Sequence, residues 1–245
     1  MDAPARVAIV TGATRGIGAA VAQRLAGDGF AVVLDYSGDA AAADEVVRRL
    51  KGGGGTAMAV QGNVADATAV RGLFDQAESA YGGVDVLVNN AGIMGVALMV
   101  ETDDESFDRH IAVNLKGTFN GMREAAKRLR RGGRIINFSS SVIGLYQPRY
   151  SVYAATKGGV EAMSKVLAKE LRGRDITVNV VAPGPTGTDL FFKGKPQTLI
   201  DELANLSPLG RLGTPDDIAR VVSFLAGPDG AWVNGQVLRA NGGAI

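Results

Sequence analysis

The sequence contains no cysteine and only one histidine among its 245 residues. Without cysteine there can be no disulfide, no thiolate zinc site and no cysteine nucleophile, and the composition is compatible with a reducing compartment. A single histidine, His110, argues against a histidine-based triad or a multi-histidine metal site. We therefore predict no metal centre. Because no partner motif accompanies His110, we expect this side chain at the surface or in an interface.

Long apolar runs and a strong charge of either sign are also missing. The formal net charge is +1, so no global field favours nucleic acid or a membrane surface. No apolar run approaches the roughly 18 residues that a bilayer-spanning helix needs. The first apolar stretch, residues 6–11, has the length of a strand and not of a signal peptide. These features predict no nucleic-acid or membrane partner and a cytoplasmic location.

Short apolar segments alternate with helical patterns along the whole chain, and apolar residues make up 46% of it. This alternation predicts an α/β fold with a doubly wound, seven-stranded parallel sheet and helices on both faces. No repeat, linker or shift in composition divides the sequence, which indicates one domain over residues 1–245. The expected strands are residues 6–11, 30–36, 56–61, 84–88, 134–138, 176–182 and 232–238.

Three segments between these strands carry more specific expectations. Residues 102–131 are predicted as one long helix, with Asn114 causing a local irregularity because asparagine competes for backbone hydrogen bonds. The basic run at residues 127–134 is interpreted as the end of that helix, with Gly132 as its cap. Residues 186–211 are long, and irregular from residue 189, for a segment inside a compact domain, which predicts a substrate lid.

A glycine-rich turn follows the first strand and precedes the first helix. Its sequence, Gly12-Ala13-Thr14-Arg15-Gly16-Ile17-Gly18, lies inside a βαβ unit, and this context favours a dinucleotide site over a ligand-free tight turn. Glycines permit a close approach of the backbone to a pyrophosphate, and the helix N-terminus adds free N–H groups and a positive dipole. The predicted contacts are Gly12, Thr14, Arg15, Gly16, Ile17 and Gly18.

The stretch around residues 138–170 contains Ser140, Tyr153 and Lys157. On a helix, residues 153 and 157 lie on one face, and a lysine ammonium beside a phenol is expected to lower the phenol pKa towards the working range of an acid or base. Ser140 follows a predicted strand, where its hydroxyl could hold a substrate oxygen. The Tyr-x-x-x-Lys pattern is weak when taken alone, so the interpretation depends on the motifs before it.

Together these motifs resemble the short-chain dehydrogenase/reductase family in order and spacing over the whole chain. The matching features are the Thr11-Gly12-x-x-x-Gly16-x-Gly18 turn, Asn89-Asn90-Ala91-Gly92, Asn114, the Ser–Tyr–Lys set and Pro183-Gly184. The middle and end most resemble 3-oxoacyl-(acyl carrier protein) reductases. The resemblance implies a Rossmann fold and an oxidoreductase that reduces a carbonyl to a secondary alcohol, with a 3-oxoacyl thioester as one candidate substrate.

The resemblance also implies roles for individual residues. The catalytic set is Asn114, Ser140, Tyr153 and Lys157; Ser140 is chosen from three consecutive serines because the family's serine stands thirteen residues before the tyrosine. The further cofactor contacts are Tyr36, Ser37, Asn63, Val64, Asn90, Ala91, Gly92, Tyr153, Lys157, Pro183, Gly184, Thr186 and Thr188.

NADP(H) is favoured over NAD(H), which stays possible. Asp35 ends the second strand, where a carboxylate would bind a free ribose hydroxyl. In the family register, however, the discriminating position is Tyr36, and adjacent strand residues face opposite ways. Arg15 stands where NADP-preferring members keep a basic residue, and Ser37 could bond the 2′-phosphate.

The resemblance leaves other functions open and implies an assembly. An NAD-dependent alcohol or sugar dehydrogenase of the same family is the first alternative, and a cofactor-sensing binding protein is the second. Epimerases and dehydratases share the Tyr–Lys pair but usually carry an added substrate region that this chain lacks. A small-molecule carbonyl or alcohol is the expected substrate, and a homotetramer is expected by analogy.

Overall fold

The computed structural model describes residues 5–245 and contains one sheet of seven parallel strands. The strand order is β3-β2-β1-β4-β5-β6-β7, and every registered pair is parallel. This confirms the predicted doubly wound sheet. The strands are β1 (Val7–Val10), β2 (Ala31–Tyr36), β3 (Ala57–Gln61), β4 (Val84–Asn89), β5 (Leu129–Phe138), β6 (Thr177–Pro183) and β7 (Val237–Ala240).

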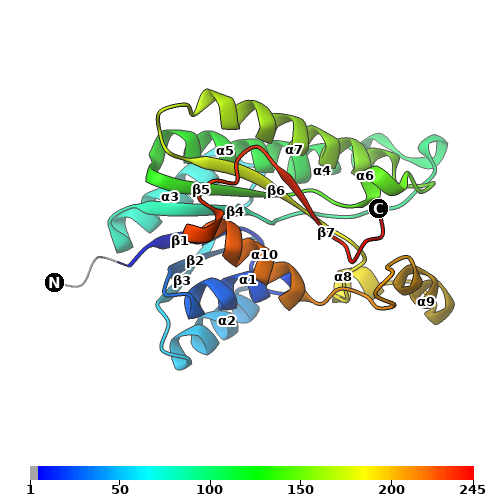
Figure 1. The fold of residues 1–245 in the computed structure, drawn as a ribbon, viewed down its shortest axis with the longest axis horizontal. Coiled ribbons are helices and arrows are strands. Elements are labelled where there is room, and N and C mark those ends of the chain that lie inside the picture. Colours follow the sequence, from blue (N-terminus) through cyan, green and yellow to red (C-terminus); the bar gives the residue numbers. More distant parts are fainter. Residues whose placement is uncertain (1–4) are drawn as a thin grey trace.

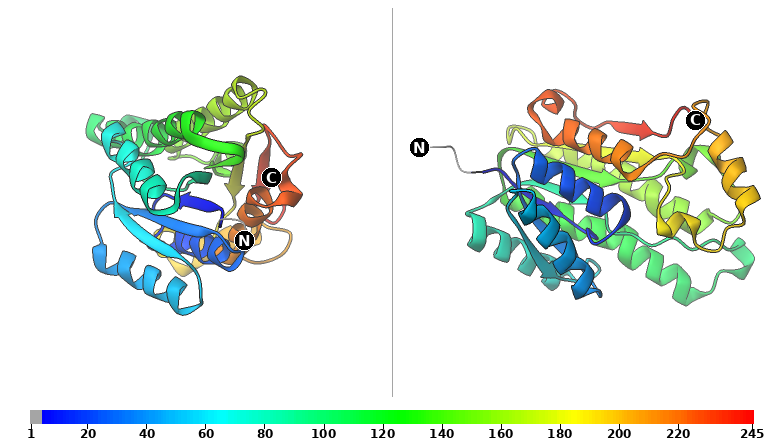
Figure 2. Two further views of the ribbon diagram at one scale, coloured as in Figure 1. Left: turned by 90° about the vertical axis from the view of Figure 1, so that its left-hand side faces the viewer. Right: turned by 90° about the horizontal axis from the view of Figure 1, so that it is seen from below.

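Helices cover both faces of the sheet, as Figure 1 and the end-on view in Figure 2 show. Each face has its own apolar core, one of which includes Leu25 and Val222 and the other Phe74 and Met122. The strands read as continuous apolar runs because they are buried from both sides. The first layer contains α1 (Gly16–Gly27), α2 (Ala40–Gly52) and α10 (Pro215–Ala226), and the second contains α3 (Ala67–Tyr81), α4 (Asp104–His110), α5 (Gly117–Arg128) and α7 (Ser151–Glu170).

The order of the strands reverses between β1 and β4. The chain moves outward from β1 to β3, then returns to place β4 on the other side of β1. Loops that leave the carboxyl ends of two such neighbours diverge to opposite faces, and ligands of open parallel sheets bind in this position. The glycine-rich turn after β1 and the Asn-Asn-Ala-Gly segment after β4 both start here.

The single helix expected at residues 102–131 is wrong in its continuity and its end. It is divided into α4, a π-helical turn, η2 (Ile111–Lys116), and α5, and a short 3-10 turn, η1 (Met99–Glu101), precedes it. The irregularity predicted at Asn114 is confirmed, because this residue lies inside η2. Gly132 is not a helix cap. It lies within β5, where it adopts a left-handed φ of 81°, the conformation that glycine also adopts when it ends a helix.

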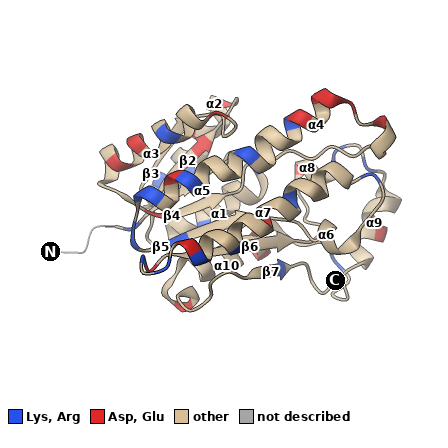
Figure 3. Cartoon of the chain, turned by 90° about the horizontal axis from the view of Figure 1, so that it is seen from above, with Lys and Arg blue, Asp and Glu red and all other residues tan. Residues whose placement is uncertain are grey.

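The basic run at residues 127–134 has a structural role. Arg128 donates to Glu78 at 2.6 Å and to Asp75 at 2.7 Å, which joins α5 to α3. Arg130 reaches Asp85 of β4 at 3.1 Å. Figure 3 shows acidic and basic residues mixed over the helices of this face. Lys127, Arg128 and Arg130 therefore pair with local carboxylates, and Arg131 and Arg134 donate to backbone carbonyls.

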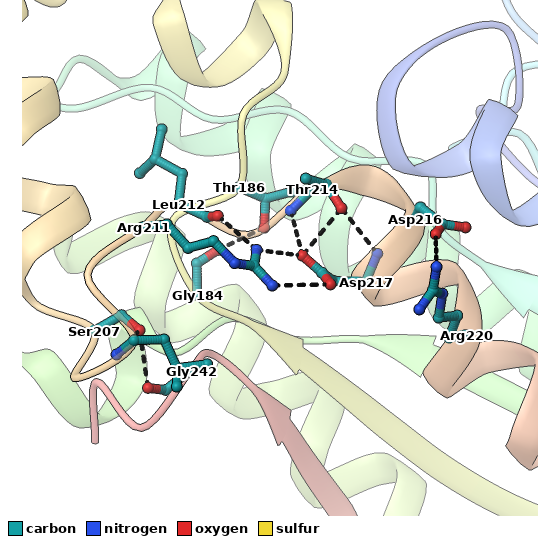
Figure 4. A network of polar contacts seen from close by, with 11 residues as sticks. Gly184, Thr186, Ser207, Arg211, Leu212, Thr214, Asp216, Asp217, Arg220 and Gly242 are labelled. Carbon is teal, nitrogen blue, oxygen red and sulfur yellow. Dashed lines mark hydrogen bonds and ion pairs between the residues drawn. The ribbon is translucent and has the colours of Figure 1, made fainter.

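The segment predicted as a lid contains two helices, α8 (Asp189–Phe192) and α9 (Gln197–Asn205), and is thus less irregular than expected. Its two ends meet, because Gly187 donates its amide to the carbonyl oxygen of Gly213 at 2.9 Å. Figure 4 shows how the far end is held: Arg211 pairs with Asp217 at 2.6 Å, and Ser207 donates to the Gly242 carbonyl at 2.9 Å. The segment predicted as a lid is therefore anchored at its base.

The end of the chain differs slightly from expectation. The last strand begins at Val237 and not at Trp232, whose side chain is 98% exposed. The remaining short helices are α6 (Val142–Leu145) and η3 (Pro228–Gly230). Over residues 5–245, no helix is long and apolar enough to cross a membrane.

Candidate functional site

The three glycines of the first turn have different physical roles. A Cβ on Gly18 would overlap the carbonyl oxygen of Gly12 and crowd Asn90, and a Cβ on Gly12 would lie 2.9 Å from the Cα of Ala91. These two glycines are thus required by the chain's own packing. Gly16 has a φ of 55°, and its Cβ would meet only the methyl group of Thr188, at 3.4 Å. Gly16 is therefore not required by packing, and it lies next to the segment that follows β6.

The helix after this turn begins without a side-chain cap. Arg15 is the N-cap residue of α1 and makes no cap hydrogen bond, whereas aspartates cap α2, α3 and α4. The first N–H groups of a helix need acceptors from outside it, and an anion at this point also meets the positive end of the helix dipole. The turn, with Thr14 and Ile17 half-buried around it, therefore fits the diphosphate of a dinucleotide.

Asp35 lies beneath the turn and does not face outward. Its carboxylate is buried and accepts a hydrogen bond from the Gly12 amide at 3.4 Å. Burial raises the pKa of Asp35 to about 7, and the bond from Gly12 opposes this rise. Tyr36 is half-buried, and Ser37 and Arg15 are exposed at the same edge. This arrangement agrees with the expectation that Asp35 points away from the cofactor position.

The segment after β4 is fixed to the glycine turn by side chains of both. Asn90 donates to the carbonyl oxygens of Thr11 and Gly12 at 2.9 and 3.0 Å. The Thr11 hydroxyl accepts from the amides of Asn90 and Ala91, each at 3.0 Å. The two loops at the switch point therefore form one unit, which holds Ala91 and Gly92 in place.

Asn114 is fully buried and points at this segment. Its Oδ1 accepts from the Ile93 amide at 2.8 Å, and its Nδ2 donates to the Ile93 carbonyl at 2.9 Å and to the Thr156 hydroxyl at 3.3 Å. The π-helical turn projects the side chain out of the helix, where it forms hydrogen bonds with the backbone of another segment. Asn114 therefore joins the loop after β4 to α7.

The three serines after β5 point in different directions. Ser139 donates to Glu161 at 2.8 Å, and the Ser141 hydroxyl accepts from Asn241 at 3.0 Å. Ser140 has neither of these partners; its hydroxyl accepts from the Val142 amide at 3.3 Å and lies close enough to Tyr153 to lower the pKa of the phenol. The arrangement agrees with the choice of Ser140 by spacing.

Tyr153 and Lys157 lie on one face of α7, with the ammonium 5.6 Å from the centre of the phenol ring. The expected effect on the phenol is reversed: burial raises the pKa of Tyr153 to about 12, although the hydrogen bond with Ser140 lowers it. Burial also lowers the pKa of Lys157 to about 8. Desolvation is the main cause of both shifts; the ammonium keeps a polar partner, since it donates to the Phe138 carbonyl at 2.9 Å, and it lies over the phenol ring.

Gly92 brings the loop after β4 into contact with this group. A Cβ at this position would lie 3.3 Å from the Oδ1 of Asn114 and 3.7 Å from the Nζ of Lys157. Residues from β4, η2, β5 and α7 thus converge at the carboxyl edge of the sheet. The convergence provides two hydroxyls and one ammonium beside a glycine loop, which suits proton transfer to an oxygen next to a planar cofactor ring.

The remaining predicted contacts follow the ends of β3 and β6. Val64 is buried, and its carbonyl accepts from Asn120 at 2.9 Å, while Asn63 bonds its own loop. Thr186 is buried and donates to the Gly184 carbonyl at 2.9 Å, so its hydroxyl is already engaged. Thr188 caps α8. Pro183 ends β6, which directs these residues to the same edge.

Several residues that hold the site were not predicted from the sequence. Thr11 was noted only as part of a motif, and Thr156 and Asn120 were not noted. His110 was expected at the surface or in an interface, and this is wrong: within the single chain it is already only 2% exposed. Its position four residues before Asn114 was the one available signal, because residues at that spacing share a helix face. In residues 5–245 no group of three or more potential metal ligands occurs.

Comparison with known proteins shows that the chain is similar to members of one family over nearly its whole length. A family model described as enoyl-(acyl carrier protein) reductase matches residues 12–244. A short-chain type dehydrogenase/reductase of Picea abies is 46% identical, covering 98% of this chain and 92% of that protein. An NADPH-dependent aldehyde reductase-like protein of Arabidopsis thaliana is 45% identical over 98% and 94% of the two chains. A solved short-chain dehydrogenase of Burkholderia cenocepacia in complex with NADP has a TM-score of 0.93 and 37% identity, covering 98% of this chain and 97% of its own.

The different roles of the glycines give a testable contrast in stability. Gly18→Ala should lower the free energy of unfolding by about 3 kcal/mol, because the added methyl group overlaps backbone atoms. Gly16→Ala should cost only about 1 kcal/mol, which is the strain of a left-handed alanine. Urea unfolding of both variants measures the difference. Equal losses in the two variants would contradict the assignment of Gly18 to packing.

Proposed function

Because the chain belongs to the short-chain dehydrogenase/reductase family, we propose that it is an NADP(H)-dependent oxidoreductase that reduces a carbonyl compound to an alcohol. The observation that carries the proposal is the meeting of Ser140, Tyr153 and Lys157 beside Gly92 at the switch point of the sheet. A binding protein would need the glycine turn but not this proton-transfer group.

Each side chain has a distinct role in the proposed reaction. NADPH supplies the hydride. Tyr153, whose pKa of about 12 keeps it protonated at neutral pH, donates its proton to the substrate oxygen as negative charge develops there. Ser140 hydrogen-bonds the same oxygen and orients it. Lys157 stabilises the phenolate that remains, and Asn114 holds the loop on which Gly92 lies.

The cofactor preference rests on the edge beside β2. Arg15 and Ser37 are exposed and present a cation and a hydroxyl, whereas the one nearby carboxylate, Asp35, is buried beneath the turn. A 2′-phosphate would find a cation there and no repelling carboxylate at the surface. The names of the Arabidopsis thaliana and Burkholderia cenocepacia proteins support the same choice.

The substrate that we propose is an apolar carbonyl compound, with a 3-oxoacyl thioester as one candidate. Exposed apolar side chains line two segments that extend beyond the same end of the sheet (Figure 1). One segment is residues 96–100 and the other is the lid. The apolar residues exposed on them are Val96, Leu98, Met99, Val100, Leu190, Phe192, Leu199, Leu206 and Leu209.

We also propose that the chain forms a homotetramer in the cytoplasm. Val166 on α7 and Phe119 on α5 are exposed on the outer face of one helical layer, and Trp232 and Phe224 are exposed near the β7 edge. Two separate apolar surfaces allow two isologous contacts, which is the requirement for a tetramer with three two-fold axes.

The experiment that tests the proposed activity is NADPH oxidation with a panel of carbonyl compounds. The panel should contain aldehydes, bulky apolar ketones and β-keto thioesters. Tyr153→Phe should lower kcat about 1,000-fold and leave NADPH binding unchanged, because only the transferable proton is lost. Tyr150→Phe, a neighbouring tyrosine whose ring centre is 6.4 Å away, is the matched control and should stay active. NADPH binding without any turnover would favour a cofactor-sensing protein, and an active Tyr153→Phe enzyme would remove the proposed acid.

The cofactor assignment gives a second expected outcome. Arg15→Ala should reduce kcat/KM for NADPH about 10-fold, the loss of one charge-assisted hydrogen bond, with little change for NADH. Arg24→Ala, at the other end of α1 and paired with Asp28, is the control and should change neither. A wild-type enzyme with higher kcat/KM for NADH than for NADPH would overturn the assignment.

The assembly can be measured directly by light scattering after size exclusion. Wild-type protein should have the mass of four chains, and Val166→Asp should give a smaller species because it places a charge in the proposed α5–α7 contact. Val100→Asp, on the exposed segment before α4, should stay tetrameric. A monomeric wild-type protein would refute the proposal.

A further inference from the structure

His110 is the only histidine of the chain, and it has no part in the chemistry proposed above. It is the last residue of α4, one turn before Asn114, and its side chain is 2% exposed. A buried imidazole costs free energy unless both ring nitrogens have partners. Its partners therefore define what this residue does.

Both ring nitrogens are bonded to backbone groups, and these groups define the tautomer. The Gly95 amide lies 2.9 Å from Nε2, and an amide N–H can only donate, so Nε2 accepts. The Ser106 carbonyl lies 2.7 Å from Nδ1, and a carbonyl can only accept, so Nδ1 carries the hydrogen. The ring is neutral, and neither nitrogen is free to relay a proton to a substrate. A catalytic role as acid or base is thereby excluded.

The hydrogen bond between the Gly95 amide and His110 is one of several that hold the backbone of residues 93–97. Asn114 holds both backbone groups of Ile93, His110 holds the amide of Gly95, and the Arg149 carbonyl accepts from the amide of Ala97 at 3.0 Å. Every second residue from 93 to 97 is thus bonded to α4, η2 or the loop before α7. This segment starts next to Gly92 and ends at the exposed apolar residues of the proposed substrate site.

The contact between His110 and Gly95 is closely fitted from both sides. A Cβ on residue 95 would lie 2.9 Å from Cε1 and 3.3 Å from Nε2 of the imidazole. Neither the ring nor the loop could move towards the other, and a larger residue at position 95 would displace the segment. The contact between His110 and Gly95 therefore fixes the position of this segment.

We propose that His110 is a positioning residue that fixes residues 93–98 as the substrate-side wall of the site. The proposal rests on the proposed function, because the wall matters only if a carbonyl substrate binds beside it. Asn114 holds the inner end of the segment near Lys157, and His110 holds the outer part, where Val96 and Leu98 are exposed. His110 therefore controls KM for bulky apolar substrates, and it leaves the proton transfer and the NADPH site unchanged.

Two substitutions at position 110 separate positioning from general stability. His110→Leu removes the acceptor of the Gly95 amide and fills the same space with an apolar side chain of similar bulk. His110→Gln keeps an acceptor and cannot become charged. His110→Leu should raise KM for a bulky apolar ketone about 10-fold, the equivalent of one lost buried hydrogen bond, with kcat within about 3-fold and the Kd for NADPH unchanged. His110→Gln should restore KM to within about 3-fold of wild type. A small aldehyde, which does not reach the wall, should show no change.

The hydrogen bond between Gly95 and His110 can also be tested by a measurement that does not depend on turnover. The Gly95 amide should exchange slowly with deuterium in the wild-type protein and at least about 10-fold faster in His110→Leu. Gly95→Ala should raise KM in the wild-type background and have a smaller effect in His110→Ala, where the methyl group finds room; this non-additivity is the mark of a direct contact.

The outcomes distinguish the two proposals. A wild-type protein that reduces no carbonyl refutes the proposed function. If the wild-type enzyme is active, an unchanged KM in His110→Leu, or a fall in kcat with KM unchanged, overturns the positioning role. Equal Gly95 exchange in both proteins overturns it as well.

Discussion

The site depends on the buried ammonium of Lys157. Removing a cation from water is costly unless polar atoms replace its hydration, and here the Phe138 carbonyl does so at 2.9 Å. Burial still lowers the pKa of the group to about 8, so the charge persists at neutral pH with a small margin. Gly92 lies next to this group: a Cβ there would be tight against the Oδ1 of Asn114, at 3.3 Å, and in ordinary contact with the Nζ of Lys157, at 3.7 Å. The charge therefore relies mainly on one carbonyl at the end of β5.

A buried polar network keeps α7 in register with the sheet, and this register decides what Tyr153 and Lys157 can reach. Asn137 of β5 donates to Ser164 of α7 at 2.9 Å and accepts from Asn89 of β4 at 2.8 Å. Just beyond the end of β5, Ser139 donates to Glu161 at 2.8 Å. Helix α7 is thus held at two successive points by the strand that delivers Ser140. Such a network specifies one geometry, because a helix that slid or rotated would leave buried polar groups unpaired.

Local pattern was enough to predict the number and order of the strands, the glycine turn and the irregularity at Asn114, although β5 begins at Leu129 and not at residue 134, and β7 begins at Val237 and not at residue 232. It failed where distant contacts decide. The long helix ends at Arg128 because the chain enters β5 there, and Gly132 imitates a helix cap through its positive φ. His110 is buried because the Gly95 loop, fifteen residues earlier, folds over it. The pKa of Tyr153 was expected to fall with the lysine nearby, but desolvation, a property of the assembled layers, raises it instead.

Burial acts in opposite ways on the two groups of the proton-transfer pair. It raises the pKa of Tyr153 to about 12, so the phenol keeps its proton in the state that donates to a carbonyl oxygen. It lowers the pKa of Lys157 to about 8, so the countercharge needed by the resulting phenolate is lost above that pH. Excluding water therefore keeps the phenol protonated, but it also makes the phenol a weaker acid and weakens the support for its conjugate base. Proton transfer to a substrate oxygen thus depends on the charge of Lys157, which must stabilise the phenolate that remains.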